Sequence, residues 1–344
     1  MSAVIRVGSS VSLRVSPRPI VVGCVLVVVV LVLAVFAVGT GEFSIAPDDV
    51  VRALFGAGDG GSVFVVQQLR LPRVLCALMV GAALGVSGAV FQSLTRNPLG
   101  SPDIVGFPQG ATVGALIVIT ILGGSGFGVT VGALIGGVLT ALAVYLLAFK
   151  RGGTSGYRLV LIGIAISFLL LSVTDYLLAR ARIEEAQEAT RWLLGSLNGR
   201  NWDDVVPLAL CLAVLAPFAV PAGRSLRALE LGDDSAFALG VRVERSRLAL
   251  VGLAVGLVSV TTVAVGPIGF IALTAPQIAR RVARTAGMPL LCSALMGAAL
   301  TLASDIAGQR LVPDRALPVG VMTGLFGGVY LAWLLTFEWR RGRA

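Results

Sequence analysis

The sequence predicts an all-α, polytopic membrane protein with about ten transmembrane helices, and three observations support that fold class. Hydrophobic residues make up 56% of the 344 residues and charged residues only 13%, and the mean hydropathy is +0.94. A soluble domain carries about 25% charged residues, which it needs to cover its surface. The apolar residues also gather in runs of about 20, the length at which a helix crosses the hydrocarbon core.

The first apolar run, residues 20–38, follows a polar segment of residues 1–19 that we expect in the cytoplasm. The run is longer than the apolar core of a signal peptide. We therefore interpret it as an uncleaved first span of a transmembrane domain covering residues 20–337. A cytoplasmic tail of residues 338–344 is expected after that domain.

The other nine predicted spans are apolar runs separated by short polar segments. They are residues 72–94, 105–122, 128–149, 159–180, 204–221, 248–266, 268–284, 291–309 and 317–336. Glycines recur in them at a spacing of four, which lets helix backbones approach closely in lipid. These glycines are Gly81 and Gly85; Gly128, Gly132 and Gly136; Gly252 and Gly256; and Gly320, Gly324 and Gly328.

The distribution of basic residues predicts the orientation, because cytoplasmic loops carry an excess of Lys and Arg. With the N-terminus inside and spans alternating, the inner segments hold 18 of the 27 basic residues. Both termini are then cytoplasmic. The net charge of +9 is explained by this topology and does not call for nucleic acid as a partner.

Three polar segments are longer than a simple turn. The outer segment 39–71 leads into Arg70-Leu71-Pro72-Arg73. The outer segment 181–203 is amphiphilic and is predicted to form a short helix along the interface. The inner segment 222–247 is the longest cytoplasmic loop. Its helix-forming stretches are broken by Gly232 and Gly240.

Several kinds of chemistry are excluded by what the sequence lacks. There is no His, the four Cys lie in apolar runs without CxxC spacing, and no phosphate-cradling GxxxxGK[ST] loop is present. We expect no resident metal and no nucleotide hydrolysis by this chain. Asp175 and Asp305 are the membrane carboxylates; each fits either a part in transport or a cap or interhelical bond. A proton-coupled secondary transporter would need more such groups than these.

Residues 234–240 suggest a short helix that ends at Gly240, a residue able to take a left-handed cap. This stretch resembles a degenerate form of the loop by which permeases of ABC importers dock on their ATPases. An ordinary loop is the alternative reading.

Longer blocks extend the resemblance: RLPRVLCALMVGAALGVSGAVFQSLTRNPLGSPDIVG (70–106), LGDDSAFALGVRVERSRL (231–248), GPIGFIALTAPQIARR (266–281) and LPVGVMTGLFGGVYLAWLL (317–335). They are similar to the FecCD/BtuC-like permeases of type II ABC importers, which take up iron siderophores and cobalamin. The resemblance covers about residues 20–337. It implies a second permease subunit, two cytoplasmic ATPase subunits that hold ATP and Mg²⁺, an external solute-binding protein, and no cofactor on this chain.

The resemblance also implies roles for particular residues. Arg70 and Arg73 would dock the binding protein, although anchoring of the second span is the alternative. Asn97, Pro98 and Leu99 would form a cytoplasmic gate, or a plain turn. The 231–240 region would couple to the ATPase through Gly232, Asp233, Asp234, Ala236 and Gly240. Candidates for lining the pathway are Ser167, Ser172, Pro318 and Thr323.

Three positions depart from the family pattern. Gln277 stands where many members have His, and Ala316 where many have Glu. Gln309 stands where many have an outer Arg, so Arg310 or Arg315 would have to replace it. The APQIARR and GQRL forms favour the ferric-siderophore branch. The expected function is thus a permease subunit in the bacterial inner membrane that imports a ferric siderophore; the alternative is a cobalamin or haem permease.

Overall fold

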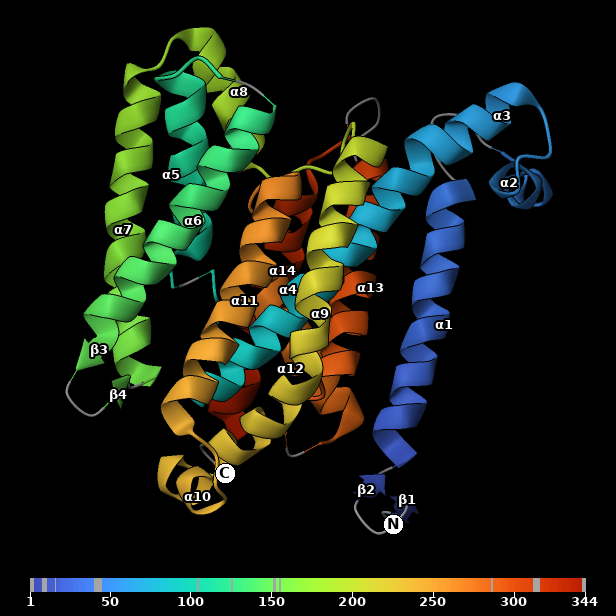
Figure 1. The fold of residues 1–344 in the computed structure, drawn as a ribbon. Coiled ribbons are helices and arrows are strands. Elements are labelled where there is room, and N and C mark those ends of the chain that lie inside the picture. The colour runs from blue at the N-terminus through green and yellow to red at the C-terminus, as the bar shows by residue number, and fades with distance from the viewer. Residues whose placement is uncertain are drawn as a thin grey trace.

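The apolar runs of the sequence form helices that pack side by side, as Figure 1 shows for the computed structural model of the chain. The structure describes residues 3–7, 11–15, 17–39, 45–103, 105–124, 126–150, 153–154, 156–285, 287–311 and 316–341. The helices at the ten predicted spans are α1 (Pro17–Gly39), α4 (Leu71–Thr95), α5 (Phe107–Thr120), α6 (Phe127–Ala148), α7 (Gly156–Arg180), α9 (Trp202–Glu230), α11 (Val243–Val265), α12 (Ile271–Ala283), α13 (Leu290–Arg310) and α14 (Val319–Arg341).

The all-α membrane class is confirmed, but the helices differ in length from the predicted spans. Within the described residues, seven helical stretches are long and apolar enough to cross a membrane, and Phe107–Thr120 and Val319–Leu334 are shorter apolar helices. The tenth, α12, has 13 residues and is about 20 Å long. It is short because Phe270 before it and Arg284 after it both have positive φ, 68° and 48°.

The segments between the spans contain further short elements. The outer segment 39–71 holds α2 (Pro47–Leu54), α3 (Gly60–Phe64) and the π-helix Val65–Arg70, which runs directly into α4. The predicted interfacial helix is present as α8 (Ile183–Leu193). Two hairpins, β1–β2 (Ala3–Val7, Val11–Val15) and β3–β4 (Phe149–Lys150, Gly153–Thr154), add the strands.

The segment predicted as the loop 222–247 is more helical than expected. Its first part is the end of α9, which runs on to Glu230, and α11 already begins at Val243. Between them lies the six-residue helix α10 (Asp233–Ala238), at the lower end of the molecule in Figure 1. The irregular part of the segment is therefore confined to the residues on either side of α10.

Helix packing follows the glycines only in part. On α4, a Cβ added at Gly81 would lie 2.3 Å from the Gly297 carbonyl oxygen of α13, and one at Gly85 would lie 2.1 Å from the Ser293 carbonyl oxygen. Gly114 of α5 and Gly132 of α6 meet in the same way. By contrast, a Cβ at Gly252 would have nothing within 4 Å. The helices α5 to α8 stand beside a second group built around α4 (Figure 1).

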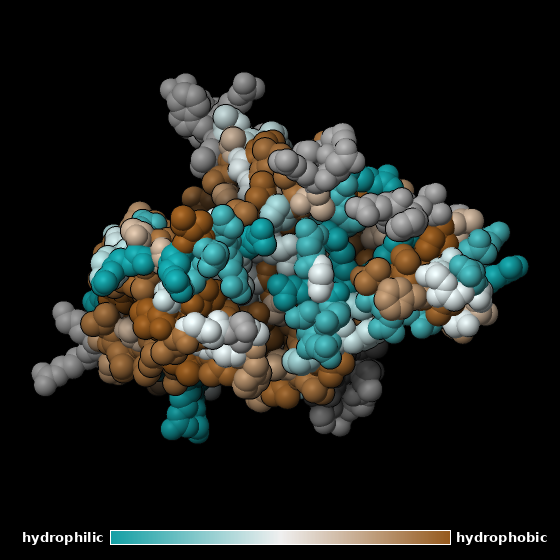
Figure 2. All heavy atoms as spheres, turned by 90° about the horizontal axis from the view of Figure 1, so that it is seen from above, coloured by the Kyte–Doolittle hydropathy of each residue, from teal (hydrophilic) through white to brown (hydrophobic). Residues whose placement is uncertain are grey.

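The surface separates into an apolar side wall and a polar end. Exposed large apolar side chains lie along α1, α6, α7 and α14, among them Val28, Leu139, Phe168 and Val329. Figure 2 looks down on the end where α8 lies, and there hydrophilic residues gather toward the middle while apolar ones form much of the rim. This is the distribution expected of a bundle surrounded by lipid.

Candidate functional site

The helix α10 is set between two glycines with positive φ, Gly232 at 111° and Gly240 at 79°. Glycine adopts such angles without the steric cost that a Cβ would bring. Ala236 at the centre of α10 is completely buried and belongs to the apolar core formed with α9 and α11. The two glycine breaks expected from the sequence thus hold α10 against the bundle as a separate element.

The outer side of α10 is apolar and exposed. Phe237 is 76% exposed and Leu239 is 65% exposed, and Leu231, just before α10, is 66% exposed. The sequence reasoning did not single out these three residues. The available signal was the presence of large apolar side chains inside an otherwise charged loop.

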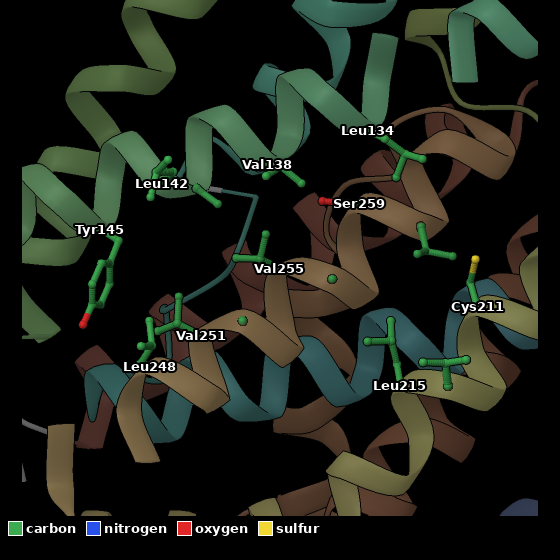
Figure 3. Close-up of a pocket in the computed structure, with 15 residues that line it drawn as sticks. Leu134, Val138, Leu142, Tyr145, Cys211, Leu215, Leu248, Val251, Val255 and Ser259 are labelled. Atoms are coloured by element: carbon green, nitrogen blue, oxygen red, sulfur yellow. The ribbon is translucent and has the colours of Figure 1, made fainter. Parts of the chain in front are cut away.

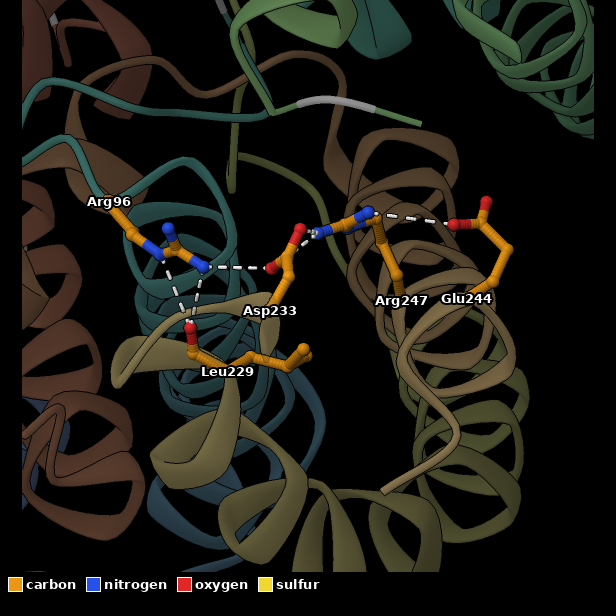
Figure 4. A network of polar contacts seen from close by, with 5 residues as sticks. All are labelled: Arg96, Leu229, Asp233, Glu244 and Arg247. Atoms are coloured by element: carbon orange, nitrogen blue, oxygen red, sulfur yellow. Dashed lines mark hydrogen bonds and ion pairs between the residues drawn. The ribbon is translucent and has the colours of Figure 1, made fainter. Parts of the chain in front are cut away.

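Asp233, the first residue of α10, lies between two guanidinium groups (Figure 4). Arg96 Nη2 is 2.8 Å from Asp233 Oδ1, and Arg247 Nη2 is 3.0 Å from Asp233 Oδ2. Arg96 also donates to the Leu229 carbonyl oxygen at 3.0 Å, and Arg247 pairs with Glu244 at 3.5 Å. The network ties α10 to the end of α4 and to the start of α11. Arg96, Arg247 and Glu244 were not among the site residues expected from the sequence.

The residues expected to form a gate, Asn97 to Leu99, directly follow Arg96. Arg96 has a φ of 49° and ends α4, and Asn97 then closes a turn in which its side-chain Oδ1 accepts the Leu99 N–H at 2.9 Å. Pro98 offers its carbonyl oxygen to Gln277 Nε2 of α12. The segment is a turn, and it is held by α10 through Arg96 and by α12 through Gln277.

Gln277 therefore has a definite contact in this structure. It is only 5% exposed, and its bond to Pro98 joins α12 to the turn. The sequence signal was the departure from the family pattern at this position. The departure drew attention to Gln277, but it did not indicate that Pro98 is its hydrogen-bond partner.

A buried carboxyl lies a few residues beyond the turn. Asp103 has its Oδ1 enclosed, and the backbone N–H of Phe270 hydrogen-bonds to its carboxyl group. Burial raises the pKa of Asp103 to about 6, against the effect of the hydrogen bonds. Phe270 is the left-handed residue that begins the short helix α12, so Asp103 supports that turn.

At the opposite end, the two arginines expected to dock a binding protein have separate internal contacts. Arg73 forms a bidentate ion pair with Asp305 of α13, at 2.9 and 2.8 Å, and Asp305 is 1% exposed. Arg70 Nη1 donates to the Val38 carbonyl oxygen at 2.8 Å. Asp305 is thus an interhelical partner, one of the two alternatives for it, and Arg73 links α4 to α13.

Arg310 and Arg315 are the candidates to replace the family's outer arginine, and the structure describes only the first of them, together with Gln309. Gln309 donates to Asp305 Oδ2 at 2.8 Å, so it joins the Arg73 ion pair. The guanidinium of Arg310 lies 4.6 Å from the centre of the Phe36 ring. Arg315 lies outside the described residues.

The structure places the four residues expected along the pathway on α7 and at the start of α14. Ser167 and Ser172 lie on α7 and bond to carbonyls of their own helix, and Ser172 is exposed. Thr323 on α14 is 1% exposed and bonds to Gly320. Pro318 lines a cavity of about 1160 Å³ at the α8 end, and the other three do not.

The fold is that of a multi-pass membrane permease subunit. The chain belongs to the FecCD transport family, whose family model matches residues 27–337.

The sequences of known relatives align with this chain over nearly its whole length. The ferric enterobactin transport system permease protein FepG of Escherichia coli is 44% identical, with 94% of this chain and 98% of FepG covered. The Fe(3+)-citrate import system permease protein YfmE of Bacillus subtilis is 37% identical, with 95% of this chain and 98% of YfmE covered. A solved structure of an inward-facing metal-chelate type ABC transporter superposes with a TM-score of 0.79 at 29% identity, covering 92% of this chain and 99% of that one.

Proposed function

We propose that this chain is the permease subunit of an ATP-driven importer for ferric siderophores in a bacterial inner membrane. It would work with a second permease subunit, two cytoplasmic ATPase subunits and an external solute-binding protein. The similarity to FepG supports an iron chelate as cargo. The chelator already ligates the iron, so this chain needs no cofactor and no histidine; ATP and Mg²⁺ belong to the ATPase.

The observation that carries the proposal is the position of α10. It presents Phe237 and Leu239 outward, as expected of a docking surface for a partner protein. Its first residue, Asp233, holds Arg96, and the turn of Asn97, Pro98 and Leu99 begins at the next position. Movement of an ATPase bound to α10 would therefore reach this turn, the proposed gate, through one ion pair.

The Arg96–Asp233 pair contributes little to folding. Both side chains are about half exposed, at 49% and 51%, and exposed pairs stabilise by about 0–1 kcal/mol. A large loss of transport on breaking this pair would thus reflect coupling and not unfolding.

At the opposite end of the molecule, we propose that Arg70 and Arg73 dock an acidic face of the binding protein. Arg73 keeps its ion pair with Asp305 while it does so. Guanidinium groups suit bidentate pairing with carboxylates. With the ATPase at α10 and the binding protein at the opposite end, both chain termini lie in the cytoplasm, on the side of α10.

The test is uptake by proteoliposomes that hold the complete importer. Asp233→Asn should lower ATP-driven ferric siderophore uptake about tenfold, while the amount of ATPase bound per permease stays the same. Arg96→Gln breaks the Arg96–Asp233 pair and leaves Arg247 its pairs with Asp233 and Glu244, so it should lower uptake by a similar factor.

Asp49→Asn is the control, since it removes the same charge from an exposed carboxylate of α2, at the other end of the molecule from α10 (Figure 1). It should transport within about twofold of the unchanged protein. Equal uptake by all these variants would refute the coupling path. Uptake without any ATPase present would refute the proposed function itself.

A further inference from the structure

An apolar groove runs along the surface between α6, α9 and α11 (Figure 3). Its volume is about 560 Å³, and on α11 it extends from Leu248 to Val260, about 18 Å at 1.5 Å per residue. Val138, Val214 and Leu248 on its walls are 57%, 66% and 49% exposed, so the groove is open at the side of the bundle. One leaflet of the hydrocarbon core is about 15 Å thick, so the groove matches one acyl chain in length.

The groove leads into the larger cavity of about 1160 Å³ at the α8 end. Leu134, Cys211 and Val260 line both spaces, so the two are continuous. The cavity contains charges of both signs: Glu188 and Arg191 of α8, and Arg200, Asp203 and Asp204 at the start of α9. Arg200 pairs with Asp204 at 3.0 Å. Glu188, Arg191 and the Asp203 carboxylate form no ion pair among the described residues.

A buried hydroxyl lies next to the junction of the two spaces. Ser259 on α11 is 4% exposed, and its Oγ has no hydrogen-bond partner among the residues that the structure describes. Figure 3 shows this oxygen directed away from α11, and a Cβ built on Gly137 of α6 would lie 3.0 Å from it. An enclosed hydroxyl without a partner carries a desolvation cost that a polar ligand atom would relieve.

We propose that groove and cavity together bind one zwitterionic phospholipid of the phosphatidylethanolamine type. An acyl chain lies in the groove, and an ester oxygen accepts a hydrogen bond from Ser259. The phosphate meets Arg191, and the ammonium meets Glu188 and Asp203. Because the lining carries both signs, it suits a head group with both charges better than an anionic one.

The experiment uses the purified full-length chain in mild detergent and native mass spectrometry. The probe is dioleoyl phosphatidylethanolamine, compared with dioleoyl phosphatidylglycerol, which lacks the ammonium, and dioleoylglycerol, which lacks the head group. We expect one tightly bound phosphatidylethanolamine and at least tenfold weaker binding of the other two. Arg191→Gln with Glu188→Gln should remove this preference.

Gly252→Leu tests the groove, because Gly252 lines it and a Cβ at this position meets nothing within 4 Å. It should weaken phosphatidylethanolamine binding at least tenfold. Gly23→Leu on α1 is the matched control, since its Cβ is equally unobstructed. It should bind as the unchanged protein does. Helical content and thermal unfolding, followed by circular dichroism, confirm that each variant is folded.

A second readout uses native cysteines. Cys211 lines both spaces and Cys24 lies on α1, and both are exposed. Bound phosphatidylethanolamine should slow maleimide labelling of Cys211 and leave Cys24 unchanged. Equal binding by Gly252→Leu and Gly23→Leu, equal affinity for the three lipids, or displacement of the lipid by a ferric tricatecholate would each overturn the proposal. The last result would place the cavity on the substrate route.

Discussion

At the scale of single residues, Arg73 and Asp305 show how a membrane protein stabilises a carboxylate that is buried from solvent. Asp305 is 1% exposed and accepts bonds from Arg73 and from Gln309. A buried charge is tolerated when its partner and further hydrogen bonds replace water. The same pair also fixes the start of α4 against the end of α13.

We predict that Arg73→Gln destabilises the protein by about 3 kcal/mol or more, because it leaves Asp305 buried without an opposite charge. Arg73→Met with Asp305→Leu should recover most of this loss. Thermal unfolding of the purified single and double variants measures the coupling. Additive losses would show that the two side chains act independently.

Asp103 gives a prediction on pH. Its folded pKa is raised to about 6 from an ordinary 3.8, so the folded state prefers the protonated carboxyl. Its contribution to stability is present below the unfolded pKa and is lost as pH rises through about 6. Asp103→Asn should therefore raise the unfolding temperature at about pH 7.5 and lose this advantage near pH 4. The control Asp234→Asn, at an exposed carboxyl, should show no such change of effect with pH.

At the scale of elements, glycine spacing predicted close helix contacts but not which helices meet. Gly81 and Gly85 do face α13, whereas Gly252, Gly324 and Gly328 have open space where a Cβ would be. Spacing shows which residues share a helix face, and only the three-dimensional packing decides what that face meets. The same limit explains α12, because the left-handed turn at Phe270 is not visible in an apolar run.

Gly85→Val should prevent α4 and α13 from packing, since its Cβ would lie 2.1 Å from a backbone oxygen that cannot move aside. We expect little folded protein after membrane extraction and early unfolding of what remains. Gly328→Val, on α14 with nothing within 4 Å, is the control and should give near-normal yield. Fluorescence-detected size exclusion compares the two, and equal peaks would contradict the close contact.

At the scale of the whole molecule, the sequence predicted the class, the positions of ten helices and the place of α10. It placed the turn at Asn97 and the helix at Asp233 in separate loops, and it missed Arg96, Arg247 and Glu244, which join them. Contacts between residues more than 100 positions apart follow from the packing of α4 against α9 and α11. A family pattern names positions, but it does not give the partners of a side chain.

The orientation is a prediction for the whole molecule. In a background with Cys24 and Cys211 replaced by Ser, we expect Ser62→Cys to react with an impermeant maleimide added outside intact cells. Ser235→Cys, on exposed α10, should react only after the cells are opened. The reverse pattern would turn the protein over in the membrane and place α10 beyond the reach of a cytoplasmic ATPase.

The α3, π and α4 segments form one uninterrupted helix, Gly60–Thr95, of 36 residues. At 1.5 Å per residue it is about 54 Å long. That exceeds the hydrocarbon core of about 30 Å, so part of this rod stands outside the bilayer. Its last turn leads into Arg96, the partner of Asp233. A rod of this length acts as a lever: a tilt of about 5° would move one end by about 5 Å relative to the other. Under the proposed orientation and docking, contact of the binding protein with the outer end of this helix would displace the Arg96–Asp233 pair without any change inside the helix.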